Sequence, residues 1–176
     1  MKIKYRKLLP NESKEYRNLR LESLQLYPMS FGSNYEEQVT REKLFFEKVI
    51  EDSLPDKFIF GAFDDKQLIG ICGFFRDREK SNRHIGTIVQ MYVKKEYQGK
   101  GIGQALLRKT IAKGFDVAAI EQIDLSVLTH QRQVNQVYEK VGFKEYGFRE
   151  KALKRNGVYQ DERFMVFYKV DYLRAR

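Results

Sequence analysis

The 176-residue sequence contains few of the residues that build disulfides and metal sites. Its one cysteine, Cys72, excludes an internal disulfide, and two histidines beside that cysteine leave little for a zinc site. We therefore expect no metal cofactor. The low cysteine content is consistent with a reducing, cytoplasmic location, and Cys72, which lies in an apolar stretch, is predicted to be a buried structural thiol.

Long apolar runs are also absent. No stretch approaches the roughly 18 apolar residues that a transmembrane helix needs, and the N-terminus lacks the apolar core of a signal peptide. We expect a soluble protein that is not exported and has no membrane partner. Linkers, repeats and low-complexity segments are missing as well, so residues 1–176, of which 42% are hydrophobic, are predicted to form a single domain.

Positive charge is in excess, with a formal net charge of +9. A solvated helix face, a site for a phosphorylated cofactor and a nucleic-acid surface all fit such an excess. A nucleic-acid surface would need aromatic side chains among the charges; only Tyr92 and Tyr97 lie near, so we expect no nucleic-acid partner. Residues 94–113 alone carry +5, from Lys94, Lys95, Lys100, Arg108, Lys109 and Lys113 against Glu96.

Hydrophobic periodicity predicts strands and helices of a mixed α/β class. Strands are expected over residues 2–9, 57–63, 68–75, 122–128, 143–148 and 161–172, with one more ending at Val93. Helices are expected from Asn11 to Leu26, from Asn34 through Ile50, from Ile102 to Ala112 and from Arg132 to Val141. The helix that begins at Ile102 either stops at Gly114 or continues to about Ala119, and residues 151–157 form a basic connection.

Two faces can be assigned within these elements. The first helix should bury a face of Tyr16, Leu19, Ser23 and Leu26, which recur at helical spacing. In the strand that ends at Val93, Val89, Met91 and Val93 should face one way and Gln90 and Tyr92 the other.

The run Gln98-Gly99-Lys100-Gly101-Ile102-Gly103 organises the chain. It follows an apolar run over Ile88–Val93 and opens a predicted helix. Glycines let the backbone turn tightly and approach a ligand closely. The first amides of a helix have no intrahelical partner, and the helix dipole is positive at that end. The run therefore predicts a site for a pyrophosphate.

The spacing of this run decides which pyrophosphate it fits. A P-loop requires a glycine five residues before the Gly-Lys pair and Ser or Thr after it, and neither is present. A dinucleotide fingerprint fails because its third glycine position is Gln104. The run instead fits [Q/R]-x-x-G-x-[G/A] through Gln98, Gly101 and Gly103. In this it resembles the acetyl-CoA pyrophosphate loop of the GNAT superfamily of N-acetyltransferases.

A second stretch strengthens the resemblance. Val137-Tyr138-Glu139-Lys140-Val141-Gly142-Phe143 is similar to the L-Y-x-x-x-G-F segment that ends the second half of the GNAT cofactor site. Tyr138 lies 35 residues after Gly103, with a predicted helix and strand between them. The order of predicted elements also resembles GNAT topology over essentially the whole chain.

The resemblance implies a GNAT-like fold and acetyl-CoA as the cofactor. The fold is a central mixed, mostly antiparallel sheet flanked by helices, whose fourth and fifth strands splay apart. Gln131 stands where the family often has Asn, and its reach is one methylene longer, so that contact is left open. The implied cofactor-binding residues are Met91, Tyr92, Val93, Gln98, Gly99, Lys100, Gly101, Ile102, Gly103, Gln104 and Gln131.

The same resemblance places Tyr138 at the position of the general acid that protonates the departing CoA thiolate. Many relatives carry a Glu on the fourth strand as general base, but this strand has no carboxylate. The base is therefore open between a water held by Gln90, an amine that arrives neutral, and a carboxylate from elsewhere. The candidate carboxylates are Glu36, Glu37, Asp161 and Glu162.

The implied activity is acetyl transfer to a primary amine of a small molecule or a peptide. Phe31, Tyr35, Glu36 and Gln90 are expected to bind that acceptor. The positive net charge argues mildly against a polycationic acceptor. A catalytically inactive CoA-binding regulatory domain is the alternative, and association into a homodimer is left open.

Overall fold

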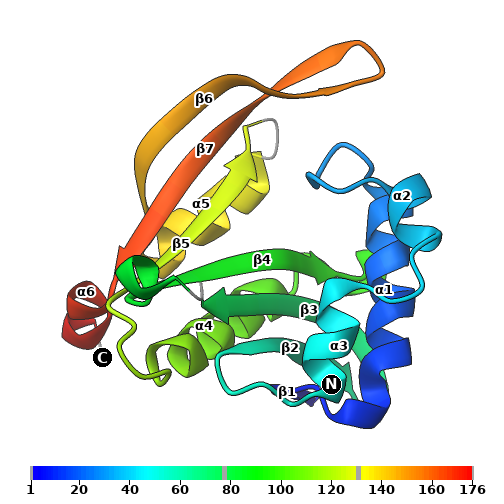
Figure 1. The fold of residues 1–176 in the computed structure, drawn as a ribbon, viewed down its shortest axis with the longest axis horizontal. Coiled ribbons are helices and arrows are strands. Elements are labelled where there is room, and N and C mark those ends of the chain that lie inside the picture. Colours follow the sequence, from blue (N-terminus) through cyan, green and yellow to red (C-terminus); the bar gives the residue numbers. More distant parts are fainter. Residues whose placement is uncertain (1, 77–78, 130–131, 176) are drawn as a thin grey trace.

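The protein is described by a computed structural model that covers residues 2–76, 79–129 and 132–175. Seven strands form one sheet in the order β1-β2-β3-β4-β5-β7-β6 (Figure 1). All neighbouring strands are antiparallel except β4 and β5, which are parallel. The strands are β1 (Ile3–Lys7), β2 (Lys57–Asp64), β3 (Gln67–Arg76), β4 (Ile85–Val93), β5 (Gln122–Leu128), β6 (Lys144–Arg155) and β7 (Val158–Tyr168).

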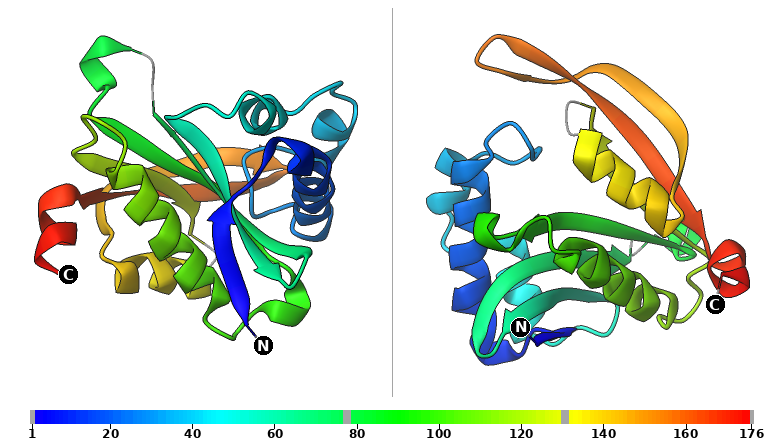
Figure 2. Two further views of the ribbon diagram at one scale, coloured as in Figure 1. Left: turned by 90° about the horizontal axis from the view of Figure 1, so that it is seen from below. Right: turned by 180° about the vertical axis from the view of Figure 1, so that it is seen from behind.

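Helices cover both faces of this sheet (Figure 2). One core lies beneath α1 and α3, and a larger one lies beneath α4 and α5. The mixed sheet flanked by helices confirms the predicted fold class. No helix in the described part of the chain is long and apolar enough to cross a membrane. The helices are α1 (Ser13–Leu26), α2 (Tyr35–Val39), α3 (Phe45–Glu51), α4 (Ile102–Phe115), α5 (Arg132–Val141) and α6 (Lys169–Arg174).

The single helix predicted from Asn34 through Ile50 is wrong, because α2 and α3 are separate. Asn34 does cap α2 by accepting a bond from the Glu37 amide at 2.8 Å. However, none of the residues of α2 is buried, so no packing against the core stabilises a longer helix. The Arg17 guanidinium donates to the backbone carbonyls of Val39, the last residue of α2, and of Arg41 and Glu42, which lie between the two helices. These bonds satisfy the backbone of the break and so stabilise it.

The first helix also differs from its prediction. It begins after a 3-10 turn over Pro10–Glu12, so Asn11 is not its cap. Its last residue, Leu26, is 56% exposed, whereas Arg20 is buried beside Tyr16, Leu19 and Ser23. Arg20 follows Tyr16 by four residues, which places it on the same face of the helix.

A β-bulge in β4 reverses part of the predicted alternation. Val89 pairs with Gly73 and Tyr92 pairs with Ile71, so two residues of β4 oppose Cys72. Gln90, at the bulge, has φ +56°. As a result Val89 joins Tyr92 in the core under α1, while Met91 packs toward α4 with Val93. The prediction that Val89 and Met91 share a face is therefore wrong.

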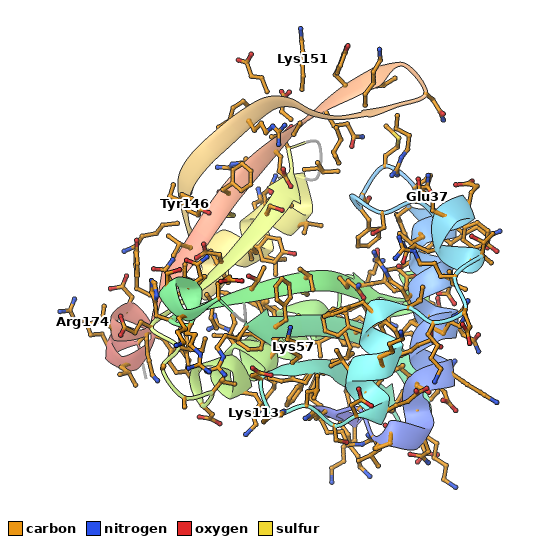
Figure 3. All side chains as sticks on the ribbon, in the orientation of Figure 1. Glu37, Lys57, Lys113, Tyr146, Lys151 and Arg174 are labelled. Atoms are coloured by element: carbon orange, nitrogen blue, oxygen red, sulfur yellow. The ribbon has the colours of Figure 1, made fainter. Side chains whose placement is uncertain are left out.

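The C-terminal strands are longer than predicted. β6 and β7 form one hairpin, with two register shifts, through the segment expected as a basic connection, and Asn156 and Gly157 are its turn at φ +50° and +80°. Positive φ at both central residues is what a type I′ hairpin turn requires. Figure 3 shows Lys151, a member of that segment, pointing away from the body of the molecule. Residues 169–172, expected as the end of the last strand, instead belong to α6.

Candidate active site

The parallel strands β4 and β5 separate after a short paired stretch. Three residue pairs join them, the last being Thr87 with Asp124, although β4 continues to Val93 and β5 to Leu128. A cleft of about 1390 Å³ opens where they part. The peptide groups of β4 that face this gap beyond Thr87 have no partner strand, so an extended ligand could pair with them.

One end of the cleft is the glycine turn before α4. Gly101 is the N-cap of α4 at φ +76°, and Gly99 has φ +73°, conformations that glycine adopts without strain. A Cβ at either position would meet nothing within 4 Å. Among the described residues, no acceptor takes a bond from the amides of residues 99–104, and the first bond of the helix runs from Ala105 to the Gly101 carbonyl.

This arrangement fits a pyrophosphate on geometric grounds. Unpartnered amides converge at the positive end of a 14-residue helix, beside an open turn. Of the predicted cofactor residues, Met91, Tyr92, Val93, Gln98, Gly99, Gly101, Gly103 and Gln104 line the cleft. The Gln98 side chain donates to the Val93 carbonyl at 2.8 Å, which holds the turn against the end of β4.

Two predicted cofactor residues, Lys100 and Ile102, do not line the cleft in the described structure. The Lys100 ammonium instead donates to the Glu96 carbonyl at 2.8 Å. Ile102 is buried in the core under α4. At Ile102 only the backbone is available to a ligand. Gln131 lies outside the described residues.

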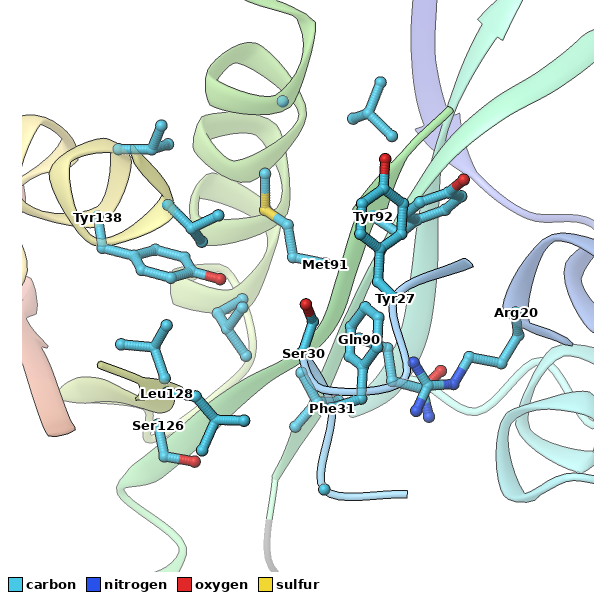
Figure 4. Close-up of a pocket in the computed structure, with 18 of the residues that line it drawn as sticks. Arg20, Tyr27, Ser30, Phe31, Gln90, Met91, Tyr92, Ser126, Leu128 and Tyr138 are labelled. Carbon is cyan, nitrogen blue, oxygen red and sulfur yellow. The ribbon is translucent and has the colours of Figure 1, made fainter. Parts of the chain in front are cut away.

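Tyr138 projects from α5 into the cleft. Its side chain is 6% exposed, its ring packs on Phe143 with centroids 6.0 Å apart, and its hydroxyl points toward the cleft interior (Figure 4). That hydroxyl bonds to no residue in the described ranges. Burial raises the pKa of Tyr138 well above its ordinary value, so the hydroxyl keeps its proton throughout the physiological range.

The Gly-Phe end of the second motif fixes the position of this tyrosine. The amides of Gly142 and Phe143 both donate to the Tyr138 carbonyl, at 3.2 and 3.1 Å. These bonds close the last turn of α5 in the manner of a helix C-cap. The motif therefore places the tyrosine relative to the sheet as well as supplying it.

The expected acceptor residues divide into two groups. Phe31 and Gln90 line the cleft, but Tyr35 and Glu36 do not. Both of the latter lie in α2, which the structure does not bring to the cleft. Gln90 Oε1 accepts a bond from the Tyr16 hydroxyl at 2.8 Å.

The candidate general bases divide in the same way. Glu162 is the one carboxylate among the described residues that line the cleft. Asp161 accepts a bond from the Lys151 amide at 2.8 Å and so stabilises the hairpin. Glu37 contributes its amide to the cap of α2.

Two cations in the acceptor part of the cleft were missed from the sequence. Arg20 and Lys57 both line it and are 3% and 8% exposed. Arg20 could have been found, because it recurs one helical turn after Tyr16 on an otherwise apolar face. Lys57 gives no such signal, since it simply begins a strand.

Comparison with known proteins agrees with the site. Residues 19–143 match the profile of the Acetyltransferase (GNAT) family. The chain is 28% identical to a spermidine N(1)-acetyltransferase of Vibrio cholerae over 143 residues, which are 81% of this chain and 80% of that protein.

Solved structures resemble the fold. An acetyltransferase of the GNAT family from Streptococcus pneumoniae superposes with a TM-score of 0.81 at 20% identity, covering 95% of this chain and 99% of that one. A putative acetyltransferase from Salmonella typhimurium, solved with its cofactor acetyl-CoA, gives 0.78 at 13% identity, with coverages of 96% and 94%. The chain therefore belongs to the GNAT family of acetyltransferases and is an acetyl-CoA-dependent N-acetyltransferase.

Proposed function

We propose that this chain, acting as a single domain, transfers an acetyl group to the primary amine of a small molecule by direct attack in a ternary complex. The observation that carries the proposal is the gap between β4 and β5, which ends at the unpartnered amides before α4. The similarity to a spermidine acetyltransferase supports a small-molecule amine as acceptor. Association into a homodimer stays a prediction.

The chain's own residues would hold the cofactor along this gap. Amides of residues 99–104 would bind its diphosphate, and the free edge of β4 at Met91 and Val93 would bind its pantetheine arm. Acetyl-CoA supplies a thioester carbonyl that a neutral amine can attack. A backbone amide beside Met91 or Val93 would donate to the thioester oxygen as it gains negative charge.

Proton transfers fall to two side chains. The Tyr138 hydroxyl holds a proton inside the cleft and would donate it to the leaving sulfur. The Glu162 carboxylate would accept a proton from the acceptor ammonium, directly or through water. Because β4 itself carries no carboxylate, Glu162 takes the place of the strand base.

The test measures two quantities on the same preparations. Release of free CoA thiol is followed with acetyl-CoA and a panel of small amines, and binding of CoA is followed by calorimetry. The proposal expects amine-dependent thiol release by the wild type and about 100-fold slower release by Tyr138→Phe with unchanged CoA binding. Tight CoA binding without turnover on any amine would instead indicate a regulatory CoA-binding domain.

A further inference from the structure

The Arg20 guanidinium is buried and has no counter-ion among the described residues. It comes from the inner face of α1, lines the cleft, and is 3% exposed. Its Nε and Nη1 are fully buried and donate to no described residue. One face of the guanidinium stacks 4.6 Å from the centroid of the Phe31 ring. That contact engages the face of the guanidinium and gives its Nε and Nη1 no acceptor.

The acidic residues nearby are already engaged. Glu47 of α3 pairs with Arg17 at 2.7 Å and also accepts from the Leu44 amide. Glu22 of α1 accepts from the Tyr92 hydroxyl at 2.9 Å. No described carboxylate therefore neutralises Arg20, although burial lowers its pKa only to about 10 and leaves it charged at neutral pH.

Gln90 presents a second free donor beside Arg20. Both side chains are neighbours of the Tyr16 hydroxyl, which is hydrogen-bonded to Gln90 and interacts electrostatically with Arg20. Figure 4 draws Gln90 on the side of β4 away from Tyr138. The Gln90 amide oxygen accepts a bond from the Tyr16 hydroxyl, and its amide nitrogen donates to no acceptor among the described residues, while the residue itself lines the cleft. The β4 bulge, with Gln90 at φ +56°, is what turns this side chain toward α1.

Arg20 and Gln90 are two hydrogen-bond donors on a part of the cleft that carries positive charge, and an anion bound there would satisfy both. A buried charge without a partner is strongly unfavourable, and the planar guanidinium matches a carboxylate with two parallel bonds. Lys57 adds a second buried cation to the lining of the same cleft. We propose that Arg20 and Gln90 bind a carboxylate of the acceptor, so that the acceptor is an amine that also carries a carboxylate, such as an amino acid, and not a polyamine.

This inference rests on the proposed acetyl transfer, because it names the class of amine. The first test therefore compares matched amines: each amino acid, its carboxamide and its decarboxylated amine, with spermidine included. We expect at least one amino acid to have kcat/KM about 100-fold above its carboxamide. Arg20→Met should abolish that preference by lowering kcat/KM for the amino acid alone. Higher kcat/KM for spermidine or for the decarboxylated amines would overturn the proposal.

A second test needs no turnover. Binding of the same amino acids is measured by calorimetry on the protein without acetyl-CoA. We expect binding to the wild type, weaker binding to Arg20→Lys, which keeps the charge but loses the fork, and none to Arg20→Met. Equal affinity of wild type and Arg20→Met, or no affinity in either, would overturn the inference even if acetyl transfer were established.

Lys14→Met is the matched control. Lys14 is exposed on the same helix, so its replacement removes one positive charge without touching the cleft. It should leave both the preference and the affinity unchanged. Arg20→Met should keep or raise the melting temperature, because it removes an unpaired buried charge. If the variant is folded, any loss of binding is due to the missing guanidinium and not to unfolding.

Discussion

The two sides of the cleft are built in different ways. On the cofactor side, the groups available to a ligand are mainly peptide amides at the edge of β4 and before α4. On the acceptor side, they are side chains from α1, β2 and the loop that carries Phe31. A backbone site depends on a few glycines in a fixed run, whereas a side-chain site depends on which elements meet. The first kind can therefore be predicted from sequence far better than the second.

Blocking the backbone site should have the largest effect. Gly101→Val places a β-branched residue at φ +76° and a Cβ in the open cradle. We expect CoA affinity to fall more than 100-fold, measured by calorimetry. The matched control is Gly147→Val, in strand β6, where a Cβ would make only ordinary contacts. If Gly101→Val bound CoA normally, the cofactor side would not depend on backbone geometry.

Removing the proposed acid should have the next largest effect. Tyr138→Phe deletes one hydroxyl that bonds to no described residue, so the fold should persist while kcat falls about 100-fold. The measurement is kcat with the best amine of the panel. Tyr146→Phe is the control, because Tyr146 is 58% exposed on β6. A kcat that dropped equally in both variants would remove Tyr138 from the chemistry.

Replacing Glu162, the one carboxylate among the described residues that line the cleft, should change the pH dependence of kcat. Glu162→Gln should lower kcat roughly 10-fold at neutral pH and restore much of it at high pH, where the acceptor amine is already neutral. Rates are measured between pH 6 and about 10. Asp161→Asn, a change next to it in the hairpin, should leave the profile unaltered. A profile that Glu162→Gln did not alter would favour an amine that arrives neutral.

The last change concerns the core rather than either side of the cleft. Burial raises the pKa of the Cys72 thiol to about 12. The pKa of the thiol in the folded protein therefore lies above its pKa in the unfolded chain. The stability that the protonated thiol contributes is complete at pH 8 and is lost between about pH 9 and 12. The free energy of unfolding should then fall by about 1.4 kcal/mol per pH unit from this group.

Cys72→Ala tests this by denaturant titrations across that pH range. The slope of the unfolding free energy against pH should become shallower by the same amount, because the thiol has been removed. The slope that remains comes from buried tyrosines such as Tyr16, whose pKa is also raised by burial. Asp116→Asn, an exposed change after α4, should leave the slope intact. An unchanged slope in Cys72→Ala would mean that the thiol already ionises in the folded state.

The same contrast explains which parts of the structure could be predicted. The glycine run and the Tyr138 motif each contain their geometry locally, and both line the cleft as expected. The bulge at Gln90 could not be predicted, because it arises from the pairing of β4 with β3. Asn156-Gly157 is a strong hairpin signal, so the sequence does contain the information that pairs β6 with β7 across this turn. A role for Arg20 could not be predicted either, because it depends on Phe31 and Gln90, which only the fold brings into its neighbourhood.

The three-residue pairing of β4 with β5 has a consequence for the folded chain itself. A row of peptide groups inside the molecule lacks a neighbour, and such an edge accepts any extended segment that reaches it. A molecule that fills the gap binds the native state alone and so shifts the folding equilibrium toward it. The lifetime of this protein should therefore follow the cellular supply of CoA, with depletion leaving the unliganded chains most exposed to proteolysis and aggregation.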